Sequence, residues 1–218
     1  YDKLIPIYKK KIKNIKVCEK KEITESNYDY KISLGSLNKY FYKSKNSKSS
    51  SLINFDNNEK NISNLILSGG KRNIGLVWSG NFFGPKEPSR SIKLKNFQKI
   101  LGLDLNFYSF QNEIWFRDKE FFNNSNIKDL SEKSFSEIIG IIQNLDLVIS
   151  TDTFFLHLSC ICGKETWGLI PLNADWRWYE YYRHNSYETL KIYKQNDYNN
   201  WDNVIQNVYS DLKNKFNI

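Results

Sequence analysis

An apolar run gives way to polar residues near residue 150. The run Leu145 to Ser150 is continuous enough to form a strand covered on both faces of a parallel sheet. Asp152 or Thr153 then stands at the start of the next helix, and His157 follows Thr153 by four residues, about one helical turn. Free N–H groups and the helix dipole favour an anion at this place, beyond the carboxyl end of the strand.

The same residue types also have a purely structural interpretation. Asp and Thr are common at the first positions of helices, where their oxygens accept bonds from backbone N–H groups. A single histidine on a short helix is often a core residue with satisfied hydrogen bonds. For Asp152, Thr153 and His157 the functional interpretation gains weight only if other polar groups reach the same edge of the sheet.

The loop after an earlier strand carries such groups. Ser79, Gly80 and Asn81 follow the predicted strand Ile74 to Trp78, and Arg90 comes shortly after them. A glycine lets the backbone approach a ligand closely, and a guanidinium neutralises a diphosphate with forked donors. The alternative is a glycine that merely makes a turn.

Gln111 ends a third predicted strand, Leu105 to Phe110. Its amide is suited to hydrogen bonding with a base or a ribose at the same edge of the sheet. A surface glutamine without a ligand is the alternative.

The elements that must position these residues alternate between short apolar runs and helix-length amphipathic runs from about Asn73 onward. This alternation is typical of an α/β fold, a Rossmann-like parallel sheet with flanking helices. The predicted strands are Ile74–Trp78, Leu105–Phe110, Leu145–Ser150 and Thr166–Ile170. The predicted helices are Leu94–Leu101, Ser134–Asn144, Thr153–Cys162, which Gly163 ends, and Trp201–Phe216. The stretch from Gln111 to about Asn126 is polar and predicts no element.

The first third of the chain differs from the rest. Lys16 to Cys18 and Tyr30 to Leu34 are predicted strands of an incomplete α/β unit, and residues 43–64 form a Ser-, Asn- and Lys-rich linker. We therefore expect a partial N-terminal unit with its linker over residues 1–72, and a ligand-binding domain over residues 73–218. The absence of any methionine suggests a piece of a longer protein.

The net charge of +8 is confined to that first third. Residues 1–72 contain 16 Lys and Arg against 7 Asp and Glu, whereas residues 73–218 contain 16 against 17. A compositional bias accounts for this, although attraction to an anionic acceptor or a membrane surface is an alternative. Nucleic-acid binding by the basic third is disfavoured, because residues 1–72 lack an aromatic-basic recognition motif.

The cysteine and histidine content argues against a metal site. Cys18, Cys160 and Cys162 form no C-x-x-C pair, and His157 and His184 are the only histidines, so the spaced ligands of a zinc site are missing. Reduced thiols in a cytoplasmic protein are expected. No run reaches the roughly 18 apolar residues that span a bilayer, so no transmembrane segment is predicted.

The order of these motifs resembles a known enzyme family. The segments Ile74–Asn81, Arg90–Ile92, Phe107–Gln111, Asp146–His157 and Pro171–Trp178 are similar to the catalytic region of bacterial tetratricopeptide-repeat-linked glycosyltransferases, relatives of the ADP-heptose:lipopolysaccharide heptosyltransferases. The Asp-Thr-x-x-x-His segment and the Asp-Trp-Arg-Trp cluster at 175–178 carry most of the likeness. It covers about residues 73–205 and is thinner over residues 1–72.

This resemblance implies the C-terminal half of a GT-B fold that holds a nucleotide diphosphate-sugar. Asp152, Thr153 and His157 would lie against the donor diphosphate. A protonated His157 would be catalytic, because it can stabilise the departing phosphate without a metal. The other implied donor-binding residues are Ser79, Gly80, Asn81 and Arg90 at the phosphates and Gln111 at the nucleoside. The nucleotide-sugar is a substrate, and no cofactor is expected.

Several parts of the reaction stay open in the sequence. The acceptor is a glycan, a lipid-linked molecule or a protein, and the catalytic base, which such folds take from the N-terminal half, cannot be assigned. The alternative is a non-catalytic nucleotide- or carbohydrate-binding module derived from such an enzyme. Trp176 and Trp178 either stack on a ligand or pack the C-terminal helix on the sheet, and Asp175 and Arg177 are a candidate ion pair.

Overall fold

The computed structural model describes residues 70–84, 89–175, 178 and 187–218, and the single residues Lys16, Cys18, Glu22 and Tyr30. The chain divides into two compact units, residues 1–48 and 49–218. The early strand predictions and the predicted linker at 43–64 lie wholly or mostly outside the described residues. The predicted boundary after residue 72 therefore stays a prediction.

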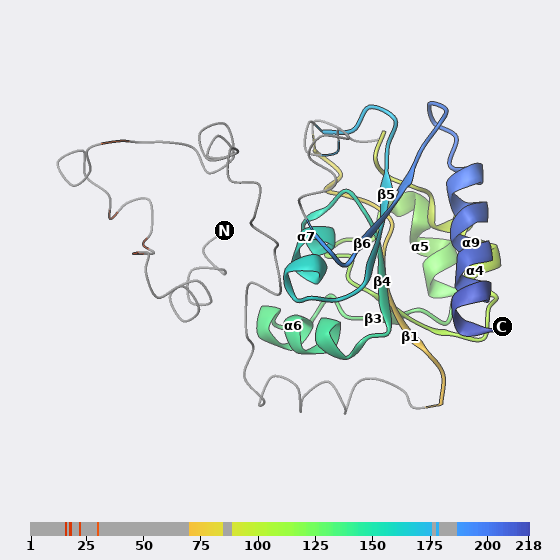
Figure 1. Cartoon of the computed structure of the whole chain (residues 1–218), viewed down its shortest axis with the longest axis horizontal. Helices are drawn as coiled ribbons and strands as arrows, with labels where there is room; N and C mark the ends of the chain where they lie inside the picture. Colours follow the sequence, from red (N-terminus) through yellow and green to blue (C-terminus); the bar gives the residue numbers. More distant parts are fainter. Residues whose placement is uncertain are drawn as a thin grey trace. The chain divides into compact units, whose positions relative to one another are not determined.

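A six-stranded parallel sheet forms the centre of the second unit (Figure 1). The strands are β1 (Asn73–Val77), β2 (Asn106–Ser109), β3 (Lys128–Asp129), β4 (Leu147–Thr151), β5 (Thr166–Ile170) and β6 (Leu190–Lys194). Their order in the sheet is β3-β2-β1-β4-β5-β6. From β1, the strands β2 and β3 are added on one side of the sheet. The chain then returns to the other side of β1, where β4, β5 and β6 are added in turn. A sheet of this kind binds ligands at the point where the order reverses, here between β1 and β4.

Helices cover both faces of the sheet. They are η5 (Leu94–Phe97), a 3₁₀ helix that continues as α4 (Gln98–Leu101), then α5 (Phe116–Asn123), α6 (Phe135–Asn144), α7 (Phe154–Ile161) and α9 (Asp202–Phe216). Figure 1 shows α6 and α7 on one side of the sheet and α4, α5 and α9 on the other. The predicted α/β fold, a Rossmann-like parallel sheet with flanking helices, is confirmed.

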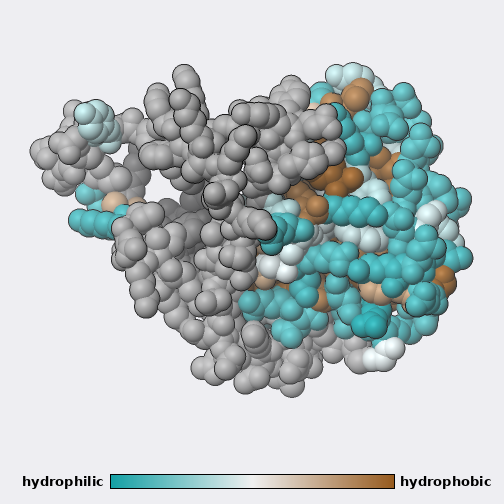
Figure 2. Space-filling model, in the orientation of Figure 1, coloured by the Kyte–Doolittle hydropathy of each residue, from teal (hydrophilic) through white to brown (hydrophobic). Residues whose placement is uncertain are grey.

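The larger core lies between the sheet and α9. Ile74 and Leu76 of β1, and Trp78 just after it, are fully buried there. They belong to one cluster with the apolar stripe of α9, which consists of Val204, Ile205, Val208 and Leu212. Each such side chain contributes about 1.5–3 kcal/mol of hydrophobic free energy. The outward residues of α9 are mostly Asp, Asn, Lys and Gln, and hydrophilic residues dominate the described surface seen in Figure 2.

Two glycines permit close packing on the opposite face. A Cβ on Gly75 would lie 2.5 Å from Cε2 of Phe110 and 2.8 Å from Cδ1 of Leu145. A Cβ on Gly168 of β5 would lie 3.0 Å from Cδ1 of Leu156 on α7. Leu156 itself is fully buried. The helix therefore packs closely because the strand beneath it provides the space.

Helix ends are set by local chemistry. Ser134 and Glu137 form a reciprocal capping box at the start of α6, in which each side chain bonds the backbone N–H of the other. Gly163 follows α7 with a φ of 72°, in the left-handed region that favours glycine, as predicted.

Among the described residues, no helix combines the length and the apolar character needed to cross a membrane.

Three of the described elements were not predicted: α5, β3 and β6. The only buried residue of α5 is Asp118, so the helix has no apolar stripe to detect. The strand β3 has two exposed residues, and β6 is an edge strand of mixed burial. Their apolar pattern is weak because they are covered on one side at most.

Candidate functional site

The loops after β1 and β4 lie side by side at the point where the strand order reverses. Val77 of β1 is in register with Ser150 of β4, so the residues that follow each strand emerge together. Ser79 and Asp152 are buried at 3% and 6% exposure, whereas Asn81 is exposed. The fold thus brings two of the three predicted groups of site residues to one edge.

Arg90 joins these two loops directly. Its Nη1 donates a hydrogen bond of 3.1 Å to the backbone carbonyl of Asp152. The guanidinium is partly buried and lies at the turn between β4 and α7. A positive charge is therefore held beside the start of α7, where the sequence predicts a diphosphate.

Gln111 reaches the same loop from the end of β2, but its amide is used inside the protein. Its Oε1 accepts hydrogen bonds from the backbone N–H groups of Trp78 and Ser79, both at 3.1 Å. Its Nε2 donates to Oγ of Ser79 at 2.8 Å. Only 4% of Gln111 is exposed, so the alternative of a surface glutamine is wrong. The side chain holds the end of β1 in place.

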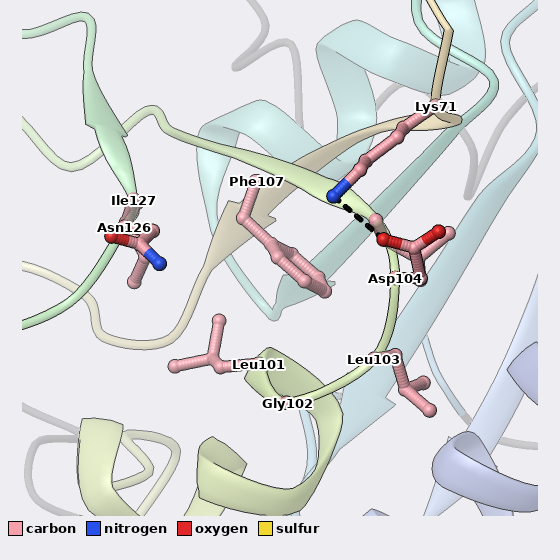
Figure 3. A pocket seen from close by; sticks show the side chains of 9 residues that line it. Lys71, Leu101, Gly102, Leu103, Asp104, Phe107, Asn126 and Ile127 are labelled. Atoms are coloured by element: carbon pink, nitrogen blue, oxygen red, sulfur yellow. Dashed lines mark ion pairs between the residues drawn. The ribbon is translucent and has the colours of Figure 1, made fainter.

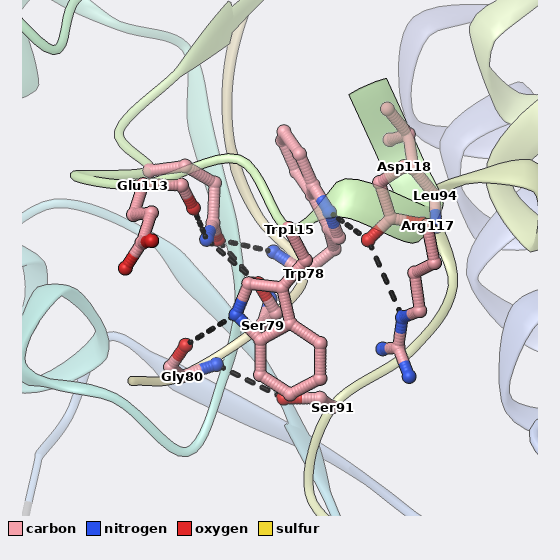
Figure 4. Close-up of polar contacts among 10 residues, drawn as sticks. Trp78, Ser79, Gly80, Ser91, Leu94, Glu113, Trp115, Arg117 and Asp118 are labelled. Atoms are coloured by element: carbon pink, nitrogen blue, oxygen red, sulfur yellow. Dashed lines mark hydrogen bonds and ion pairs between the residues drawn. The ribbon is translucent and has the colours of Figure 1, made fainter. Parts of the chain in front are cut away.

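Gly80, which follows Ser79, is held by hydrogen bonds at both its N–H and its carbonyl (Figure 4). The N–H of Gly80 donates to Oγ of Ser91 at 3.0 Å, and the carbonyl of Gly80 accepts from Nε1 of Trp115 at 3.2 Å. The side chain of Asn81 accepts a bond from the N–H of Phe83 at 3.1 Å, which turns the chain back. The loop is therefore ordered by its own contacts.

Asp118 is a supporting residue that the sequence did not reveal. Its carboxylate is 2% exposed and accepts hydrogen bonds from Nε1 of Trp78 at 3.1 Å and from the N–H of Leu94 at 2.9 Å. Nε of Arg117 lies 3.6 Å away and balances the charge. A buried carboxylate is tolerated only with such partners. The sequence held no signal for it, because Asp118 lies in a polar stretch with no predicted element.

Thr153 is the N-cap residue of α7. The sequence predicted either Asp152 or Thr153 at this position. Thr153 has an extended backbone and its side chain makes no cap hydrogen bond. Its hydroxyl instead lies 3.0 Å from Oγ of Ser150. The first-turn N–H groups of α7 are therefore not occupied by this side chain, and with the helix dipole they favour an anion.

His157 lies one turn along α7 and is neither sealed nor remote from the other residues. Its side chain is 26% exposed, and its Nε2 lies 3.9 Å from Oδ1 of Asp152. Its Nδ1 lies 3.1 Å from the hydroxyl of Tyr187, and its ring stacks on Trp178 with centroids 5.5 Å apart. Arg90, Asp152 and His157 thus form one continuous set of contacts.

Trp178 is a packing residue, as one of the two interpretations had it. It is 5% exposed and packs with Leu156, Cys160 and Ile170. It therefore packs against α7 and β5, and the expectation that it holds the C-terminal helix is wrong. Trp176 and Arg177 lie outside the described residues.

Other titratable groups near α7 are structural. Burial raises the pKa of the Cys160 thiol to about 11, which keeps it protonated at neutral pH. Burial lowers the pKa of Lys164, whose ammonium donates to the carbonyl of Leu145. In the part of the chain that the structure describes, no group of three or more His, Cys, Asp or Glu side chains is arranged to hold a metal.

Two pockets lie at the opposite edge of the sheet, before the strands begin. One, of about 370 Å³, is lined by residues that include Lys71, Leu105 and Ile127, and the Lys71–Asp104 ion pair of 2.6 Å lies beside it (Figure 3). The other, of about 540 Å³, includes Arg72 and Asp146. Neither of these two pockets contains a predicted site residue.

Solved structures with a similar fold exist, although no family model and no curated protein sequence matches the chain. The ADP-heptose LPS heptosyltransferase II of E. coli aligns with a TM-score of 0.54 at 13% identity, over 74% of this chain and 52% of that one. A glycosyl transferase family 9 protein of Veillonella parvula aligns with a TM-score of 0.46 at 11% identity, over 72% of this chain and 46% of that one. The chain spans about half the length of the heptosyltransferase and shares its fold over that half.

Proposed function

We propose that this chain is the donor-binding part of a GT-B-type glycosyltransferase, which moves a sugar from a nucleotide diphosphate-sugar to an acceptor without a metal. The hydrogen bond between Arg90 and the carbonyl of Asp152 carries the proposal. It sets a permanent positive charge beside the start of α7, at the crevice where parallel sheets of this order bind nucleotides. The fold shared with half of a heptosyltransferase supports the same assignment.

The donor diphosphate would lie between the two loops. The first-turn N–H groups of α7 and the guanidinium of Arg90 would bind its oxygens from one side. The hydroxyl of Ser79 accepts a bond from Gln111 and retains its own proton to donate, and Asn81 is exposed beside it. Gly80 would allow the phosphates to approach the backbone closely. Gln111 would contribute to nucleoside binding by fixing this loop.

The proposed reaction places negative charge where these groups lie. The bond between the anomeric carbon and the diphosphate oxygen breaks, and a bond from that carbon to the acceptor oxygen forms. The nucleoside diphosphate leaves with an additional negative charge, which Arg90, the α7 amides and His157 would stabilise. The acceptor, a glycan, a lipid-linked molecule or a protein, loses its proton to a catalytic base.

Nucleotide titration tests this proposal. Calorimetry of the full chain with ADP, UDP and GDP is expected to show binding of at least one of them without added metal. Removing a charge-assisted hydrogen bond to phosphate costs about 1.5–3 kcal/mol, so Arg90→Ala is expected to weaken binding roughly 10- to 100-fold. Arg72→Ala is the matched control. Arg72 also pairs with a residue far away in the sequence, Asp146 at 2.9 Å, but it lies at the opposite edge of the sheet.

Two results would count against the proposal. One is the absence of binding by all three nucleotides, and the other is binding that neither Arg90→Ala nor the pair Asp152→Ala and His157→Ala weakens. Binding without any transfer or hydrolysis of a nucleotide-sugar, tested with the parent protein, would instead support the non-catalytic module.

A further inference from the structure

The imidazole of His157 is held by residues from a different part of the chain. Tyr187 comes just before β6 and Trp178 follows β5, whereas His157 is on α7. The hydroxyl of Tyr187 lies 3.1 Å from Nδ1, and the ring of Trp178 stacks on the imidazole at an interplanar angle of 16°. Nδ1 thus lies beside the hydroxyl of Tyr187, and Nε2 lies beside Oδ1 of Asp152.

These surroundings favour one neutral form of the ring. The carboxylate of Asp152 accepts hydrogen bonds only, so it favours a proton on Nε2, although 3.9 Å is an ion-pair distance and too long for a hydrogen bond. The Tyr187 hydroxyl can donate to a bare Nδ1. Both neighbours therefore favour the tautomer with the proton on Nε2. In the other tautomer, with the proton on Nδ1, the lone pair of Nε2 would face the Asp152 carboxylate.

Stacking on Trp178 limits rotation of the ring. Trp178 is 5% exposed and is itself packed against Leu156 and Cys160. Turning the imidazole over would replace Nδ1 by a carbon beside Tyr187 and lose that hydrogen bond. Packing therefore restricts the orientation of the ring, and the Asp152 carboxylate and the Tyr187 hydroxyl favour a proton on Nε2.

We propose that Tyr187 is a positioning residue that keeps the proton of neutral His157 on Nε2, so that this nitrogen is a hydrogen-bond donor for a diphosphate oxygen. The consequence for the ligand rests on the proposed function. With the proton on Nε2, His157 donates to an anion even when the imidazole carries no charge. Affinity for a nucleoside diphosphate then does not depend on prior protonation of the ring.

Nitrogen-15 NMR of the full chain tests the tautomer without any ligand. His157 and His184 are the only histidines, so a His184→Gln background leaves one imidazole, which is observed at a pH where it is neutral. The expected spectrum has a protonated Nε2 and a bare Nδ1. Tyr187→Phe, which keeps the ring of Tyr187 and removes its hydroxyl, is expected to shift both nitrogens towards a tautomer mixture.

Tyr193→Phe is the matched control. Its hydroxyl also makes a hydrogen bond, to Asp211 at 2.7 Å, but on the α9 side of the sheet. This variant is expected to leave the His157 spectrum unchanged. A bare Nε2 in the His184→Gln protein, or a Tyr187→Phe spectrum identical to it, would overturn the proposal. The first of these results does not require the Tyr187→Phe variant to fold.

Nucleotide affinity provides the second measurement. For whichever of ADP, UDP or GDP binds, Tyr187→Phe is expected to weaken binding about two- to tenfold, the range of one ordinary hydrogen bond, and Tyr193→Phe to leave it unchanged. If no nucleotide binds although the tautomer behaves as expected, the proposed function fails and the positioning role of Tyr187 stands. Equal affinity of Tyr187→Phe and the unsubstituted chain would overturn the link between tautomer and ligand.

Discussion

The indole N–H of Trp78, at the end of β1, donates a hydrogen bond of 3.1 Å to the buried carboxylate of Asp118 on α5. The second oxygen of that carboxylate accepts the N–H of Leu94, where η5 begins. One side chain thus joins the strand, the following helix and α5. The loop that starts at Ser79 depends on this connection for its starting direction.

Asp118→Ala is expected to destabilise the protein by about 2–4 kcal/mol, because it leaves two buried N–H groups without an acceptor. Asp118→Asn, which keeps an acceptor oxygen, is expected to cost less. Urea denaturation measures both. Asp104→Ala is the control, since the Asp104 side chain is 73% exposed, and no measurable change is expected. Equal losses in Asp118→Ala and Asp104→Ala would contradict the prediction.

Gln111→Leu is expected to weaken the binding of ADP, UDP and GDP by a similar factor, because it disturbs the loop and not the base. It also leaves the N–H groups of Trp78 and Ser79 without an acceptor, at a cost of about 2–4 kcal/mol in urea denaturation. Gln111→Glu keeps that acceptor but buries a negative charge, so only part of the stability should return. A loss of affinity confined to one base would show direct contact with the nucleoside instead.

Gly75→Ala is expected to destabilise the fold by about 1–3 kcal/mol, because its methyl group would overlap Phe110 and Leu145. Thermal or urea unfolding measures the change. Gly102→Ala is the control, because a Cβ there meets only carbonyl oxygens at 3.5 Å and 3.6 Å and the backbone is already helical. The idea fails if both substitutions have the same effect.

The stabilising effect of Asp211 is expected to depend on pH. Hydrogen bonds from Lys191 and Tyr193 lower the pKa of Asp211 below the ordinary carboxyl value. A group whose pKa is lowered by folding stabilises the protein above its unfolded pKa, and this contribution is lost as the pH falls through the folded pKa. Asp211→Asn should therefore reduce the free energy of unfolding at pH 7 and lose that effect in acid. A difference that persists unchanged at the lowest pH would refute the assignment.

Local pattern was sufficient for the elements with a continuous apolar signal. The run Leu145 to Ser150 predicts a strand, and β4 covers Leu147–Thr151. The apolar repeat of Trp201 to Phe216 predicts a helix, and α9 covers Asp202–Phe216. These elements bury a strand on both faces or a full stripe of a helix, so the required residue types recur at a fixed period. The placement of Thr153 and His157 on one short helix is local in the same way.

Only the tertiary structure decided which distant side chains meet. The strand order puts β1 between β2 and β4, and this order brings Gln111 to Ser79 and Arg90 to Asp152. The helix containing Asp118 was not predicted, because its buried residue is charged and its apolar pattern is absent. Hydrogen-bond partners far apart in sequence leave no periodic signal, since each requires one polar atom at one position. The sequence alone therefore determined the layers of the fold and the local α7 motif, and the tertiary structure decided the contacts that hold the site.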